Sequence, residues 1–81
     1  MKIRCILVDD EPLARQGLRE YISDTGFLEL AAEFDSPLKA AEWIGQNPVQ
    51  LLFLDIQMPR ITGLELFKSL PAPPPVIFTT A

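Results

Sequence analysis

The 81-residue chain carries seven basic and eleven acidic side chains, a formal net charge of −4. Nucleic-acid-binding surfaces need clustered Lys and Arg to replace phosphate counterions, so this acidic balance with scattered cations argues against such a surface. Apolar residues make up 48% of the chain and charged residues 22%, which is typical of an ordered globular protein. The length predicts one small domain with a modest core.

Two residue types narrow the possible chemistry further. The chain has no histidine, which excludes imidazole metal sites and Ser-His-Asp or Cys-His catalysis. Its single cysteine, Cys5, lies within an apolar run and is expected to be a small buried hydrophobe, as fits a reducing cytoplasm. The first residues lead into a run too short for a signal peptide, and no stretch approaches the length of a membrane span. We therefore expect a cytoplasmic protein with no membrane partner.

Strands and helices are predicted to alternate from the start of the chain. Ile3–Val8 is a short run rich in β-branched residues, which predicts a strand. Pro12 then opens a helix in which apolar residues recur at helical spacing as far as Ile22. Gly26 is expected to end that helix, and Leu28–Phe34 supplies a second strand.

The same alternation continues through the middle of the chain. Ser36 is predicted to cap a second helix that has Pro37 at its first position and ends between residues 45 and 48. The third strand, Leu51–Leu54, is apolar at every position, the pattern of a central parallel strand covered by helices on both faces. Asp55 closes that strand.

The last third of the chain completes the pattern. Residues 56–62 form a predicted loop, and Gly63–Leu70 a short helix with Leu64 and Phe67 facing inward. The proline-rich residues 71–75 cannot be helical and form a stiff connector to a fourth strand, Val76–Thr80. Four strands and three helices in strict alternation predict an α/β protein with a doubly wound parallel sheet and right-handed crossovers.

Acidic residues stand where two of the predicted strands end. Asp9 and Asp10 follow the first strand, and Asp55 follows the third. Because the carboxyl ends of parallel strands share one edge of the sheet, these three carboxylates are expected to converge. Acids at strand-to-helix turns are common as acceptors for helix N-terminal amides, but three together are better explained by a cation. Hard oxygen ligands of this kind suit Mg²⁺.

Three segments around these acids and at the end of the chain carry a family pattern. They are Leu7-Val8-Asp9-Asp10-Glu11-Pro12, continued by Leu13-Ala14-Arg15, then Leu54-Asp55-Ile56-Gln57-Met58-Pro59 with Gly63, and Ile77-Phe78-Thr79-Thr80-Ala81. On these segments the chain resembles the receiver domain of bacterial two-component response regulators, over its whole length. The resemblance implies a flavodoxin/CheY-like fold with strand order 2-1-3-4 and a fifth strand beyond these residues. Some of the same segments resemble receivers that precede LytTR-type (AlgR-type) DNA-binding domains.

The resemblance also implies a role for individual residues. Asp55 would accept a phosphoryl group from a histidine kinase as an acyl phosphate, and the chain would act in signalling rather than as an enzyme. Asp10, Asp55 and the backbone carbonyl of Gln57 would ligate Mg²⁺ directly, and Asp9 would do so through a water molecule. Thr80 would bind the phosphoryl group as the switch hydroxyl.

Two neighbouring features complete that assignment. Thr79, next to the switch hydroxyl, is expected to point to the opposite face of its strand, by the period of two along a strand. Met58-Pro59 and Gly63 would shape the loop beside Asp55 without doing chemistry.

One departure from the family pattern concerns a lysine. Receivers pair the phosphoryl group with a lysine at the end of a fifth strand, which residues 1–81 do not include, and Lys2, Lys39 and Lys68 are not placed to replace it. The chain is therefore expected to be the first two-thirds of a receiver, without its output domain, and to form the acyl phosphate poorly. Its fourth strand, with Val76, Ile77 and Phe78, would be an open edge that favours a homodimer or a domain swap.

Three other readings compete with a phosphoacceptor. A Mg²⁺-dependent aspartyl phosphatase also uses an aspartate at a strand end, but its Asp-x-Asp pattern is absent. A nucleotide-binding module would need a phosphate-cradling first turn in place of an acidic one. The more serious alternative is a truncated, phosphorylation-incompetent receiver that acts as an interaction module.

Overall fold

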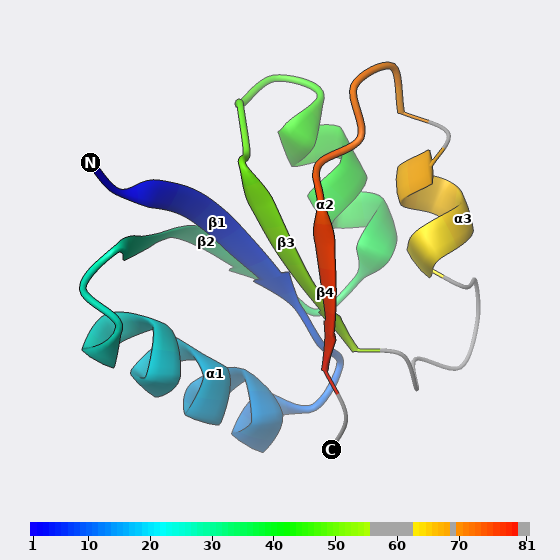
Figure 1. Cartoon of the computed structure of the whole chain (residues 1–81). Helices are drawn as coiled ribbons and strands as arrows, with labels where there is room; N and C mark the ends of the chain where they lie inside the picture. Colours follow the sequence, from blue (N-terminus) through cyan, green and yellow to red (C-terminus); the bar gives the residue numbers. More distant parts are fainter. Residues whose placement is uncertain (56–62, 69, 80–81) are drawn as a thin grey trace.

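The computed structural model describes residues 1–55, 63–68 and 70–79, in which strands and helices alternate as predicted (Figure 1). Leu70 lies beyond the end of α3, although the predicted helix included it, and Asp55 is the last residue of β3 rather than the first residue after it. The elements in chain order are β1 (Ile3–Val8), α1 (Pro12–Asp24), β2 (Leu28–Phe34), α2 (Pro37–Ile44), β3 (Leu51–Asp55), α3 (Gly63–Lys68) and β4 (Val76–Thr79).

The strands form one parallel sheet in the order β2-β1-β3-β4, which confirms the predicted topology. β1 lies between β2 and β3, with Val8 paired to Phe34 on one side and to Leu54 on the other. α1 covers one face of the sheet, and α2 and α3 cover the other (Figure 1). The carboxyl ends of β1 and β3 are therefore neighbours at one edge.

Alternate residues of the central strands enter two separate cores. Ile6 of β1 packs in the cluster beneath α2 and α3, which includes Phe67 of α3. Cys5, one residue earlier, packs in the cluster that contains Ile22 of α1. β3 is divided in the same way, with Leu52 on the α2 side and Phe53 on the α1 side. The predictions that β3 is central and that Cys5 is a buried hydrophobe are both confirmed.

The helices begin and end close to the predicted residues, but the predicted side-chain cap of α2 is not formed. Ser36 occupies the N-cap of α2 in an extended conformation, but its side chain makes no capping hydrogen bond. Its backbone carbonyl instead accepts a hydrogen bond of 3.2 Å from the Ala40 N–H. α1 ends at Asp24 with Thr25 as its C-cap, one residue before the predicted stop at Gly26, and the Thr25 hydroxyl donates to the Tyr21 carbonyl at 2.9 Å.

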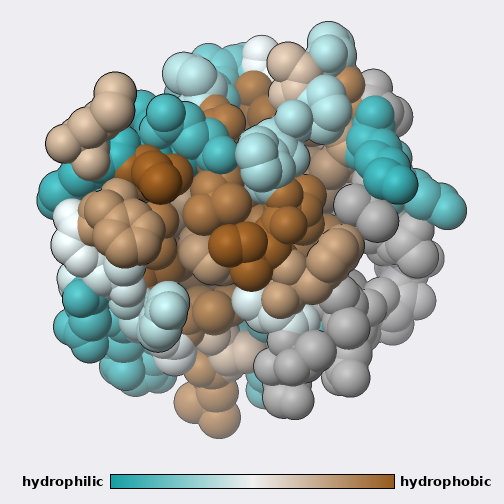
Figure 2. Space-filling model, viewed as in Figure 1, coloured by the Kyte–Doolittle hydropathy of each residue, from teal (hydrophilic) through white to brown (hydrophobic). Residues whose placement is uncertain are grey.

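β4 is the edge of the described sheet on the side away from β2. Ile77 is 46% exposed and Phe78 47% exposed, as expected of an open edge. Val76 was predicted to be exposed with them, but it is half-buried because it packs against the cluster beneath α2 and α3. Figure 2 shows apolar side chains gathered across the middle of the face on which β4 lies.

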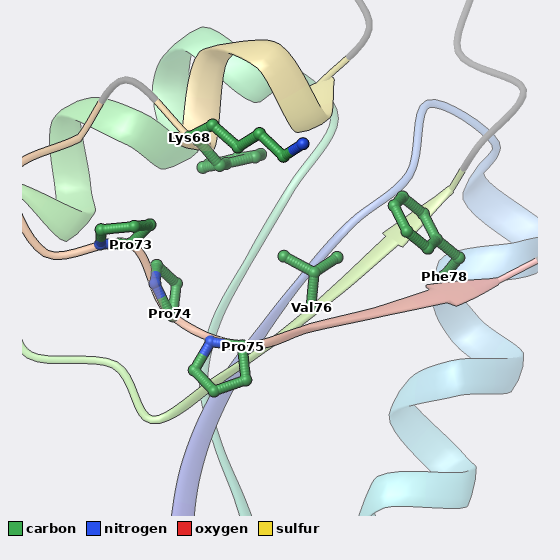
Figure 3. A pocket seen from close by; sticks show the side chains of 7 residues that line it. Lys68, Pro73, Pro74, Pro75, Val76 and Phe78 are labelled. Carbon is green, nitrogen blue, oxygen red and sulfur yellow. The ribbon is translucent and has the colours of Figure 1, made fainter.

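A groove of about 470 Å³ runs between α3, the proline-rich connector and β4 (Figure 3). Its walls are mostly apolar, and the described residues that line it include one charged side chain, Lys68. The groove is formed by Phe67, Lys68, Pro73, Pro74, Pro75, Val76 and Phe78. Among the described residues, no helix has the length and apolar character needed to cross a membrane.

Candidate metal centre

Three carboxylates meet at the carboxyl edge of the sheet, as the sequence predicts. Asp9 directly follows β1, Asp55 is the last residue of β3, and these strands are hydrogen-bonded neighbours. One carboxylate oxygen from each of Asp9, Asp10 and Asp55 lies within 4.8 Å of the others. Asp9 is only 3% exposed and Asp55 7%, whereas Asp10 is exposed. The cluster is thus two buried acids with a third at its solvent side.

Asp9 is held by hydrogen bonds through its backbone and its side chain. Its N–H donates to the Phe34 carbonyl at 3.0 Å, which ties the turn to the end of β2. Its Oδ1 accepts a bond of 2.9 Å from the Glu11 N–H, and its carbonyl accepts one of 2.8 Å from Nη1 of Arg15. The acid is therefore oriented by the fold itself.

The electrostatics of the cluster favour uptake of a cation. Burial raises the pKa of Asp9, and the neighbouring charges of Asp55 and Asp10 raise it further, while the Glu11 N–H acts in the opposite direction. A positive ion among the three carboxylates would offset both the burial and the mutual repulsion. Carboxylate oxygens with an exposed side open to water are the donors that Mg²⁺ takes in proteins. The residues present therefore fit this ion.

An ion-pair network of Arg15, Arg19 and Glu33 borders the cluster and was not predicted from the sequence. Nε of Arg15 lies 3.7 Å from Oε1 of Glu33, and Glu33 also accepts two hydrogen bonds from Arg19, at 2.7 and 2.9 Å. The hydrogen bond from Arg19 is the main reason that the pKa of Glu33 is lowered. The sequence does contain a signal for this network. Arg15 and Arg19 are four residues apart and so lie on the same side of one helix. Glu33 is a charged residue near the end of a largely apolar strand.

Thr79 lies beside Asp55 in the sheet. The two residues are register partners in the β3–β4 pair, and the Oγ1 of Thr79 is buried without a hydrogen-bond partner among the described residues. The predicted site residues Gln57 and Thr80 lie outside the described residues, as do Met58 and Pro59.

The fold and the acidic edge together define a doubly wound α/β domain with a candidate cation site at its strand ends. Residues 5–81 match the model of the response regulator receiver domain family. The chain belongs to this family of signalling domains, which confirms the resemblance to receiver domains but does not test the LytTR type.

Full-length relatives extend well beyond the aligned region. The chain is 40% identical to an uncharacterized response regulatory protein of Shewanella oneidensis and 38% identical to the transcriptional regulatory protein BtsR of Escherichia coli K12. Each match covers 98% of this chain but 34% of the relative. The chain thus spans about a third of the length of the curated relatives that it matches.

Solved receiver structures share the fold. A signal receiver domain from Mycobacterium tuberculosis superposes with a TM-score of 0.84 at 28% identity, covering 99% of this chain and 67% of that one. The response regulatory domain of mrkE from Klebsiella pneumoniae gives a TM-score of 0.82 at 29% identity, with 98% and 67% covered. These matches confirm the predicted α/β receiver fold.

Proposed function

We propose that this chain is a phosphoacceptor receiver, in which Asp55 takes a phosphoryl group from a sensor histidine kinase. The observation that carries the proposal is the meeting of Asp55 with Asp9 and Asp10 at the strand ends of a chain that belongs to the receiver family. A carboxylate oxygen of Asp55 would form the new O–P bond as the N–P bond to the kinase histidine breaks. The products are an acyl phosphate and a neutral imidazole.

The acidic cluster is the proposed place of Mg²⁺. Asp10 and Asp55 would hold the ion directly, with the backbone carbonyl of Gln57, and Asp9 would hold it through water. When bound, the ion neutralises charge on the transferred phosphoryl group. The hydrogen bonds to Asp9 keep its carboxylate in place before any ligand arrives. We further propose Thr80 as the hydroxyl that binds the phosphoryl group.

The role of the full protein is proposed from the relatives, because this chain covers only about a third of their length. One of them is named a transcriptional regulatory protein, and we propose the same role for the full protein to which these residues belong. A LytTR-type DNA-binding output domain is proposed from the segments at residues 9–15, 55–59 and 78–81. We propose a cytoplasmic signalling protein that at most assists its own phosphotransfer and dephosphorylation.

Phosphoryl uptake from acetyl phosphate tests this function. We expect a Mg²⁺-dependent mass increase of one phosphoryl group, mapped to the peptide that contains Asp55. Asp35→Asn is the matched control, because Asp35 is an exposed acid that pairs with Lys39 and is not one of the three clustered carboxylates. Uptake at another residue would contradict the proposal. Mg²⁺ binding without any uptake would favour the interaction module.

The open edge of β4 is a second proposed contact, made with another copy of this 81-residue chain. Unpaired backbone groups at a sheet edge pair readily with a second strand, and Ile77 and Phe78 are half-exposed there. We expect sedimentation to show a concentration-dependent dimer or larger assembly, and Ile77→Lys to shift it toward monomer. A well-folded monomer at high concentration would contradict this contact.

A further inference from the structure

Residues 9–11, the acidic turn, join β1 to α1. Arg15 contacts this turn through the backbone of Asp9 rather than through a carboxylate. It lies near the start of α1 and is half-buried, and its Nη1 donates a hydrogen bond of 2.8 Å to the carbonyl of Asp9. Its own N–H donates to the Glu11 carbonyl at 3.0 Å. Arg15 is thus joined to both ends of the short segment between β1 and α1.

The remaining bonds of this segment leave it little freedom. The Glu11 N–H donates to Oδ1 of Asp9, and the Asp9 N–H donates to the Phe34 carbonyl. The N–H of Asp9 is therefore engaged by β2, its carbonyl by α1, and its carboxylate by Glu11 of the same segment. Loss of the Arg15 contact would free the carbonyl and, with it, the peptide plane between Asp9 and Asp10.

Glu33 and Arg19, which lie outside the acidic turn, orient the Arg15 side chain. Glu33 lies 3.7 Å from Nε of Arg15 and is anchored by the two hydrogen bonds from Arg19. Glu33 also directly precedes Phe34, whose carbonyl receives the Asp9 N–H. The end of β2 therefore supports the acidic turn through its backbone and, by way of Arg15, through a side chain.

We propose that Arg15 is a positioning residue that sets the affinity of the acidic cluster for Mg²⁺ by fixing the Asp9–Asp10 peptide. The inference rests on the proposed function, because it assumes that the cluster takes a cation. Groups that orient metal ligands without touching the metal are worth about 10–100-fold in metal affinity. We expect the lower part of that range, because water can reach a freed carbonyl near the surface.

The direction in which the Mg²⁺ affinity changes when Arg15 is removed distinguishes a positioning role from an effect of its charge. A guanidinium near three carboxylates repels an incoming cation, so if its charge alone mattered, removal of Arg15 would tighten Mg²⁺ binding. If Arg15 only joined α1 to β2, its removal would lower the melting temperature and leave the affinity of the folded protein unchanged. Positioning alone predicts weaker binding despite the loss of a positive charge.

Calorimetric titration of the 81-residue chain with MgCl₂ tests this inference. We expect Arg15→Met to weaken Mg²⁺ binding about tenfold at a temperature where the variant is folded, and Arg15→Lys, which keeps a donor, to restore part of the loss. Lys39→Met is the matched control, because it also removes one cation but from an exposed pair with Asp35. Arg19→Met leaves the bond to Asp9 in place and should weaken binding less than Arg15→Met.

Each outcome is informative. Equal or tighter binding by Arg15→Met, with wild-type binding intact, overturns the positioning role and leaves the proposed function standing. Should Arg15→Met fail to fold, unchanged affinity in Arg15→Lys and in Glu33→Gln would overturn it instead. Absence of Mg²⁺ uptake by the wild-type chain would overturn the proposed function and this inference together.

Discussion

Replacing Asp55 with asparagine is expected to stabilise the metal-free chain and to remove most of its Mg²⁺ affinity. The carboxylates of Asp9, Asp10 and Asp55 lie within 4.8 Å of one another, so loss of one charge relieves repulsion when no cation is bound. The same change removes an anionic ligand, for which we expect at least a tenfold loss in affinity. Each kcal/mol of relief should raise the melting temperature of the metal-free chain by about 4–8 °C.

The pH dependence of that stabilisation has a definite sign. Burial and the charges of its neighbours raise the pKa of Asp9 above its ordinary value in the folded state. The folded state therefore holds the proton more tightly, and the associated stability is present at low pH and lost as pH rises through the raised pKa. The advantage of Asp55→Asn in the absence of metal should accordingly be full at neutral pH and shrink as the pH falls through the raised pKa of Asp9, which lies above the ordinary carboxyl value of about 4.

Asp35→Asn provides a control of opposite sign. Lys39 lowers the pKa of Asp35 by a hydrogen bond and by its charge, so that pair contributes stability above the ordinary carboxyl pKa that is lost on acidification. The control should lower or leave unchanged the melting temperature at neutral pH and should bind Mg²⁺ normally. Melting curves in EDTA check the stability, and Asp55→Asn melting below wild type at neutral pH would contradict the account.

Truncation of Phe67 to alanine is expected to produce the largest loss of stability. Phe67 is 1% exposed in the cluster beneath α2 and α3, and burial of this kind is worth about 3–5 kcal/mol. A domain of this size has only about 4–12 kcal/mol in total. Because α3 spans six residues, Gly63–Lys68, it cannot hold its helical form without that packing. We expect a fall of at least about 12 °C in melting temperature.

Phe27→Ala is the matched control for Phe67→Ala. Phe27 is 58% exposed, and its contribution to the fold includes a backbone bond, from the Ile3 N–H to its carbonyl at 2.7 Å, which alanine retains. The loss there should be below about 1.5 kcal/mol. Similar melting temperatures for the two variants would show that α3 is not anchored by the Phe67 side chain.

The order of elements was predictable because local and global signals agree in this chain. Pro12 and Pro37 each stand at the first position of a helix, and an apolar run marks each strand. Leu51–Leu54 is apolar throughout, the pattern expected of a strand with helices on both faces. The convergence of Asp9 and Asp55 then follows from the parallel topology, since both end neighbouring strands at the same edge.

Side-chain contacts between elements that are distant in the sequence could not be predicted in the same way. The bond from Arg15 to the Asp9 carbonyl and the pairing of Arg15 and Arg19 with Glu33 depend on how α1 packs against the end of β2. Tyr21 is 63% exposed although it precedes the buried Ile22 in α1, and the sequence does not show how narrow the stripe of this helix is that faces the sheet. Ser36 has the right residue type for a cap, yet its side chain makes no capping bond.

Binding of beryllofluoride, a mimic of the acyl phosphate, in the presence of Mg²⁺ is the measurement that would show whether Asp55 is a phosphoacceptor. Amide NMR shifts of the 81-residue chain would be followed first with Mg²⁺ and then with beryllofluoride. We expect Mg²⁺ to shift the amides of Asp9, Asp10 and Asp55, beryllofluoride to shift them further, and Asp55→Asn to abolish the second response. A folded wild-type chain that responds to neither ligand would show that the three acids do not form a phosphoacceptor site.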